Sequence, residues 1–91
     1  SKKVQDDIKG APKSFTEMLT VTAVNTVSNA TKTVADVTKA LLFVNGQMLF
    51  SGDSTPAFTI TTGGVITWNA TNAWYSLATT DEVAIQYPTN Q

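Results

Sequence analysis

The chain has 91 residues, a formal net charge of -1 and 14% charged side chains, and it contains neither cysteine nor histidine. A chain of this length forms one small domain. Disulfides and the commonest transition-metal ligands are excluded, so oligomerisation remains as the added source of stability that small domains need. All the basic residues are lysines, and without arginine or a basic patch the composition argues against nucleic-acid binding.

The sequence also argues against a membrane role. No apolar run approaches the roughly 20 residues of a spanning helix, and the run over residues 40–44 is far shorter. Lys2 and Lys3 are not followed by an apolar segment, so we expect no signal peptide. A leading methionine is expected to have been removed before Ser1. We expect no metal and no cofactor.

The first 13 residues differ from the rest because nearly half of all charged side chains fall there. Val4 and Ile8 stand four apart, which places both on one side of a short helix. Two interpretations stay open: a frayed tail, or an arm that becomes ordered on a neighbouring subunit. We therefore predict an N-terminal arm over 1–13 and a β domain over 14–91. The candidate partner-binding residues of the arm are Lys2, Lys3, Val4, Ile8 and Lys9.

Alternating apolar residues predict strands from Ser14 onward. Leu19, Val21 and Ala23 alternate with their neighbours as in a half-buried strand. Residues 25–29 interrupt the pattern, and a strand is predicted to resume over 32–38. A helix over 33–42 is the competing assignment, but the Val and Thr content argues against it. The continuous apolar run over 40–44 is typical of a strand covered on both faces.

Two pairs of residues signal hairpins. Asn45 and Gly46 tolerate positive φ at both central positions of a tight turn, so 40–44 and 47–50 are predicted to pair. Residues 51–56 form a polar turn. A second turn at the paired glycines 63 and 64 would place two apolar pairs on one face, which suits a core. These residues are Phe58, Ile60, Ile66 and Trp68.

The last predicted strand begins at Asp81 and Glu82 and ends at Pro88, because proline cannot donate to a ladder. Leu77 is expected to be buried, and alternation directs three residues inward: Val83, Ile85 and Tyr87. The turn signals recur about every 8–12 residues. Together these patterns predict an all-β fold, a small antiparallel β-sandwich or barrel of six to seven strands with an extended N-terminal arm.

Catalytic chemistry is not indicated. Histidine is absent, and the adjacent carboxylates of Asp81 and Glu82 point to opposite faces of a strand. Residues 51–54, which read Ser-Gly-Asp-Ser, resemble a nucleophile loop but lack a base and the G-x-S-x-G frame, so a tight turn is favoured. A calcium site at Asp53 would need more oxygens than this stretch supplies. We expect a protein that is not an enzyme.

The aromatic residues are the strongest candidates for binding. Trp68 is expected in the core, whereas Trp74 and Tyr75 fall in a predicted loop over 69–75. Three interpretations stay open for this pair: a platform on which sugars stack, an interface hot spot, or packing of Trp74 over one end of the sandwich.

Several segments resemble small β-modules in structural proteins of tailed bacteriophages. In those modules a strand ending in V-N-G-Q leads to an aromatic-T-x hairpin and then to a closing D-x-V-x-I-x-Y strand. The corresponding residues here are 41–47, 58–60, 65–68, Leu77 and 81–87. The resemblance covers about the C-terminal half of the chain. It implies that Asn45 and Gly46 make a turn and that Phe43, Val83, Ile85 and Tyr87 fill the core.

The resemblance implies a virion structural protein without catalytic residues. We expect a capsid decoration or cement protein, made in the host cytoplasm, that lies on the outer shell and bridges major capsid protein subunits. It would form a homo-oligomer, with a trimer favoured. The alternatives are a carbohydrate- or receptor-binding module of a head fibre or tail, which would use Trp74 and Tyr75, and a small tail or connector component.

Overall fold

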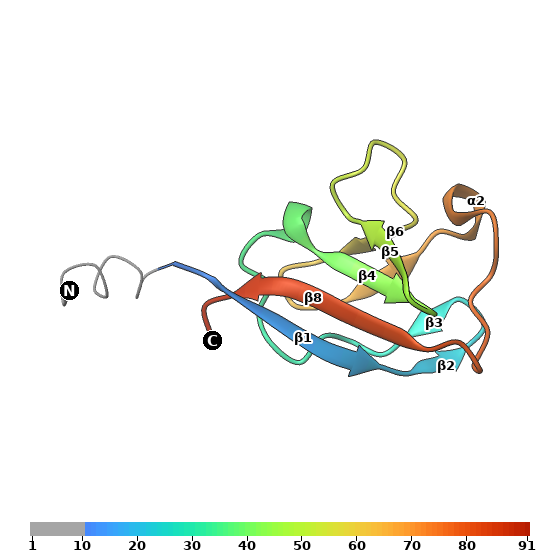
Figure 1. The fold of residues 1–91 in the computed structure, drawn as a ribbon, viewed down its shortest axis with the longest axis horizontal. Helices are drawn as coiled ribbons and strands as arrows, with labels where there is room; N and C mark the ends of the chain where they lie inside the picture. The colour runs from blue at the N-terminus through green and yellow to red at the C-terminus, as the bar shows by residue number, and fades with distance from the viewer. Residues whose placement is uncertain (1–10) are drawn as a thin grey trace.

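The computed structural model describes residues 11–91 and has an all-β fold, as predicted, with eight strands rather than six or seven (Figure 1). One 3-10 turn, η1 (Val37–Lys39), and a one-turn helix, α2 (Ala70–Ala73), accompany the strands. The strands are β1 (Lys13–Leu19), β2 (Val21–Ala23), β3 (Thr26–Val27), β4 (Leu41–Val44), β5 (Gln47–Phe50), β6 (Phe58–Ile60), β7 (Ile66–Trp68) and β8 (Val83–Thr89).

The strands form two layers. The main sheet has the order β1-β8-β4-β5, and every neighbouring pair in it is antiparallel. The hairpins β2–β3 and β6–β7 form two small sheets, and β6–β7 lies behind the main sheet in the view of Figure 1. Contacts between β3 and β7 join the two hairpins. The hydrophobic core lies between the main sheet and these hairpins.

The predicted core residues of the C-terminal half are confirmed. Val83, Ile85 and Tyr87 of β8 are buried, as is Leu77. In the β6–β7 hairpin Phe58 lies opposite Trp68, and Ile60 lies opposite Ile66, with all four side chains buried. The alternation of apolar and polar residues therefore set the inward face correctly in these strands.

The Asn45–Gly46 turn is also confirmed. Both residues have positive φ, 49° and 87°, and the turn joins β4 to β5 directly after the facing pair of Val44 and Gln47. This is the geometry of a two-residue hairpin whose twist matches that of the flanking strands.

The predicted strand over 32–38 is wrong. Residues 32–36 form an irregular segment, and Asp36 caps η1 by accepting a hydrogen bond from the backbone N–H of Thr38 at 3.0 Å. Val34 and Val37 are three residues apart, so they never had the alternation of a strand. Val34 is nevertheless buried, and its N–H donates to the carbonyl of Thr62 at 2.9 Å. The segment thus packs against the β6–β7 turn rather than joining a sheet.

Pro88 does not end the last strand, because β8 continues to Thr89. The carbonyl of Pro88 accepts from the N–H of Ala35 at 2.8 Å, on the side away from β1. In an extended residue the nitrogen and carbonyl point to the same side, so the missing N–H costs no bond to β1. The strand also starts at Val83, after Asp81 and Glu82.

Two expectations about β4 are wrong. Leu42 and Val44 are buried, but Leu41 and Phe43 are only partly buried and face the other way. The run is therefore covered on one face, and Phe43 does not fill the core. The reason is that β4 has β8 and β5 at its edges, while the second layer covers the main sheet on the side of Leu42 alone.

Candidate interaction surfaces

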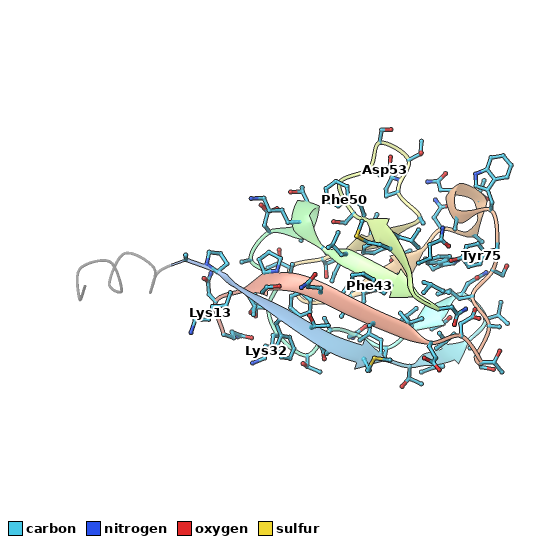
Figure 2. All side chains as sticks on the ribbon, in the orientation of Figure 1. Lys13, Lys32, Phe43, Phe50, Asp53 and Tyr75 are labelled. Carbon is cyan, nitrogen blue, oxygen red and sulfur yellow. The ribbon has the colours of Figure 1, made fainter. Side chains whose placement is uncertain are left out.

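Within residues 11–91 no second layer covers the face of the main sheet opposite the core, and we call it the outer face. Strand register places Met18 beside Ala84, Ala84 beside Phe43, and Phe43 beside Met48, so one apolar row crosses all four strands. The next row runs through Thr16, Gln86, Leu41 and Phe50. Ser14 and Pro88 complete the face. Phe43 and Phe50 are labelled in Figure 2 on β4 and at the end of β5.

None of these outer-face residues is charged, and three large apolar side chains at the ends of the two rows are strongly exposed. Met18 is 67% exposed, Met48 is 56% exposed and Phe50 is 46% exposed. From the usual spacing of strands and residues, the face covers on the order of 350 Å². Apolar patches of a few hundred Å² on a monomer are often functional, so the outer face is the first candidate binding surface.

Trp74 is the most exposed large apolar residue of residues 11–91, at 92%. It ends α2 in the left-handed conformation, with φ of 71°, and its N–H donates to the carbonyl of Ala70 at 2.9 Å. The predicted loop over 69–75 thus contains a helical turn, which Asn69 caps by accepting from the N–H of Asn72. The indole does not pack over the end of the sandwich, and it is free to contact a partner.

Tyr75 has a different environment from Trp74. Its ring packs against that of Trp68 with centroids 5.3 Å apart, and its carbonyl accepts from the indole N–H of Trp68 at 3.2 Å. Burial, with a contribution from nearby Asp81, raises the pKa of the Tyr75 hydroxyl. No aromatic contact within residues 11–91 joins Tyr75 to Trp74. The structure therefore separates the two predicted site residues, and they do not form one flat platform.

The arm residues Lys2, Lys3, Val4, Ile8 and Lys9 lie outside the described residues. The part of the segment that is described enters β1 at Lys13, which pairs with Thr89, so the strand starts one residue before the predicted boundary. Pro12 lines a groove of about 330 Å³ on the outer face, together with Ser14, Leu41 and the neighbouring Lys39.

The Ser51 turn has a structural role. The hydroxyl of Ser51 donates to the carbonyl of Val37 at 2.8 Å and accepts from the N–H of Ala40 at 3.0 Å. Asp53 is exposed, and its carboxylate accepts from the N–H of Thr55 at 3.4 Å. Within residues 11–91 no group of three or more His, Cys, Asp or Glu side chains is placed to hold a metal ion.

A second polar link lies at the other end of β4. Asn45 donates from its side-chain amide to Asp81 at 3.0 Å and accepts from the N–H of Glu82 at 2.9 Å. The backbone N–H of Ala78, together with Asn45, holds the pKa of the Asp81 carboxyl below its usual value. The Asp81 carboxylate and the backbone N–H of Glu82 therefore secure the entry to β8.

Comparisons with known proteins return nothing: no family model, no curated protein and no solved structure matches the chain. In the part of the chain that the structure describes, no helix is long and apolar enough to cross a bilayer.

The outer face was not identified as a site from the sequence. Each of its apolar residues alternates with a core residue, as Phe43 does with Leu42 and Val44. Once the Asn45–Gly46 turn is fixed, the register of β4 and β5 places Phe43 beside Met48. That row was readable from the sequence, but which face lacks a covering layer was not.

Proposed function

We propose that this chain is a non-enzymatic structural protein of a tailed-bacteriophage virion. In this proposal it is a decoration or cement protein that binds the outer capsid surface and bridges major capsid protein subunits. The observation that carries the proposal is the uncharged outer face with its row of exposed methionines. Covering such a face with a protein surface removes apolar side chains from water, which favours binding. Because the strand residues of the face are uncharged, binding does not bury an unpaired charge there.

The segments that resemble phage modules support the same proposal. Two of them, residues 41–47 and 81–87, contain β4, the Asn45–Gly46 turn and most of β8. These elements form the centre of the main sheet and contribute Phe43, Ala84 and Leu41 to the outer face. The residues that carry the resemblance thus also build the surface to which we assign the contact.

The outer face alone is too small for a stable protein–protein interface, so capsid binding would need a second contact surface. Stable interfaces bury about 800 Å² on each partner, and the face alone offers on the order of 350 Å². In this proposal the arm over 1–13 extends the contact, and the support for it is that Pro12 and Ser14, where the chain enters β1, line the groove on the outer face. Removing residues 1–12 is therefore expected to weaken capsid binding and to leave the sheet intact.

The test is co-sedimentation with empty capsid shells of a phage that encodes the chain, stripped of the native protein. A Met18→Lys, Met48→Lys double variant places two charges on the outer face and should weaken binding at least tenfold, about 1.4 kcal/mol. The control is Val65→Lys. Val65 is 48% exposed but lies in the β6–β7 turn, away from this face. Equal binding by all three proteins would contradict the proposal.

A second candidate function is carbohydrate binding by Trp74, as in a head-fibre or tail module. The observation that favours it is the 92% exposed indole at the end of α2. A glycan array would show binding that Trp74→Ala abolishes. Glycan binding that survives this substitution, or no binding at all, would count against this candidate.

A further inference from the structure

In the described part of the chain, one edge of the β1 backbone has no hydrogen-bonding partner, and the contact of Pro88 shows which β1 residues point their N–H and C=O groups toward that edge. Because the carbonyl of Pro88 points away from β1, the facing pair of Pro88 and Ser14 exchanges no hydrogen bonds. Backbone direction alternates along a strand, so Ser14, Thr16 and Met18 all point their N–H and C=O groups away from β8. No turn or side chain within residues 11–91 hydrogen-bonds to these groups.

The opposite edge of the main sheet is less available. β5 has four residues against the seven of β1. Val44 and Gln47 close a two-residue hairpin, so Met48 and Phe50 point their backbone groups outward. The carbonyl of Phe50 already accepts from the N–H of Asp53 at 3.3 Å. Very short edge strands resist pairing with other chains, and β1 has no such protection.

We propose that β1 pairs with β1 of a second copy, antiparallel and about a two-fold axis, to make one continuous eight-stranded sheet. The axis would pass between the Thr16 residues of the two copies, since Thr16 is the middle residue of Lys13–Leu19. Ser14 would then face Met18 of the second copy. In this register every free N–H and C=O group of the three residues meets a partner.

The uncharged side chains of β1 suit this register, and Glu17 is the residue whose charge must be accommodated. On the outer face Thr16 meets Thr16, a favourable cross-strand pair. On the inner face Glu17 lies opposite Phe15 of the second copy and diagonal to both its Lys13 and its Glu17, so one opposite charge and one like charge flank this carboxylate. An inward carboxylate on an edge strand normally discourages pairing. Here Glu17 is already bound by Thr31 and Tyr87 of its own chain, so it stays paired when a second strand arrives.

The pairing has a consequence that rests on the proposed function. It joins two outer faces into one surface on the order of 700 Å², which approaches the roughly 800 Å² of a stable interface. The β1 pairing also makes the protein a dimer, whereas the phage resemblance favours a trimer. Two-fold contacts of this isologous kind are the commonest in soluble homo-oligomers.

The first test is the mass of the full chain in solution, measured by sedimentation equilibrium over a dilution series. We expect a dimer. Thr16→Pro removes an outward N–H without removing a bond to β8, so it should give a folded monomer with unchanged circular dichroism. Met48→Pro makes the same change on the free edge of β5 and should remain a dimer. A monomer or trimer at every concentration would overturn the proposal, as would dissociation by Met48→Pro alone.

A cross-linking variant decides the matter if Thr16→Pro does not fold. The chain has no cysteine, so Thr16→Cys introduces one thiol. Facing hydrogen-bonded residues have Cα atoms about 5.5 Å apart, within reach of a disulfide. After oxidation, the Thr16→Cys variant should run as a covalent dimer on a non-reducing gel, and the Met48→Cys variant should run as a monomer. A cross-link in Met48→Cys alone, or in neither variant, would overturn the proposal. If the chain is a monomer that binds capsids, the β1 pairing is wrong and the proposed function stands. If the chain is a dimer that does not bind capsids, the proposed function is wrong and the pairing stands.

Discussion

The hydroxyl of Tyr87 donates a hydrogen bond of 2.5 Å to the carboxylate of Glu17, which joins β8 to β1 on the inner side of the main sheet. The same carboxylate accepts from the backbone and the hydroxyl of Thr31, at 2.9 and 2.8 Å. The Tyr87 hydroxyl in turn accepts from the N–H of Lys32 at 3.1 Å. The Glu17 carboxylate and the Tyr87 hydroxyl therefore hold Thr31 and Lys32 against the sheet, at the start of the segment 32–38 that was predicted to be a strand.

This cluster makes stability depend on pH. Burial acts to raise the pKa of the Glu17 carboxyl, but hydrogen bonds from Tyr87 and Thr31 and the charge of Lys32 outweigh it and bring the pKa below 4.5. A lowered folded pKa means that the stabilisation is complete above the unfolded pKa and is lost as the pH falls through the folded value.

Tyr87→Phe should therefore lower the free energy of unfolding by about 1.5–3 kcal/mol at neutral pH, and by less once Glu17 is protonated. Urea unfolding over a pH series measures this. Tyr75→Phe is the control, because the hydroxyl of Tyr75 makes no hydrogen bond within residues 11–91. A loss for Tyr87→Phe that is constant down to acid pH would show that Glu17 is not the acceptor that matters.

The two adjacent glycines of the β6–β7 turn should respond very differently to substitution. Gly64 has φ of 90°, and an added Cβ would lie 2.7 Å from the carbonyl oxygen of Ala30. At Gly63 the nearest atom to an added Cβ would be 3.8 Å away. Gly64→Ala should destabilise the fold by about 1–3 kcal/mol, and Gly63→Ala by much less. Chemical denaturation of both variants measures this, and equal losses would argue against the turn geometry.

Neighbouring leucines in β4 should report which face of the main sheet is covered. Leu42 is fully buried, whereas Leu41 is partly exposed on the outer face. Leu42→Ala should cost about 2–5 kcal/mol through lost contacts and a cavity. Leu41→Ala should cost clearly less in the isolated protein, measured by the same denaturation experiment. A larger loss of stability for Leu41→Ala than for Leu42→Ala would mean that β4 directs Leu41, and not Leu42, into the core.

The two aromatic residues after α2 should also separate in stability measurements. Trp74→Ala should change the free energy of unfolding by less than about 0.5 kcal/mol, because the side chain is almost wholly in solvent. Tyr75→Ala removes a ring that packs on Trp68 and should cost about 1 kcal/mol or more. Thermal unfolding of the two variants tests this, and a larger loss for Trp74→Ala would place its indole against the protein.

The elements that could be predicted from the sequence depend on neighbours along the chain. The Asn45–Gly46 turn, the β6–β7 pairing and the inward residues of β8 follow from turn chemistry and alternation. The errors depend on partners distant in sequence. Pro88 stays within a strand, and its carbonyl accepts from the N–H of Ala35. Residues 32–36 are irregular because their N–H groups donate to Tyr87, Thr62 and Pro88 instead of to a neighbouring strand.

The candidate sites divide in the same way. The sequence placed Trp74 in a loop but left open whether its indole is exposed or packs over one end of the sandwich, and the packing of Tyr75 on Trp68 needed the turn of α2 that lies between them. The outer face depends on the register of four strands and on where the second layer ends. Neither can be read from any single segment of the sequence.

The most direct measurement is a cryo-electron microscopy map of phage particles that carry the chain, at a resolution that shows side chains. The account predicts that Met18, Phe43 and Met48 are covered by the capsid shell and that the β6–β7 turn faces solvent. A map in which the shell contacts the molecule through α2 or the β6–β7 turn, with the methionine row open to solvent, would contradict it.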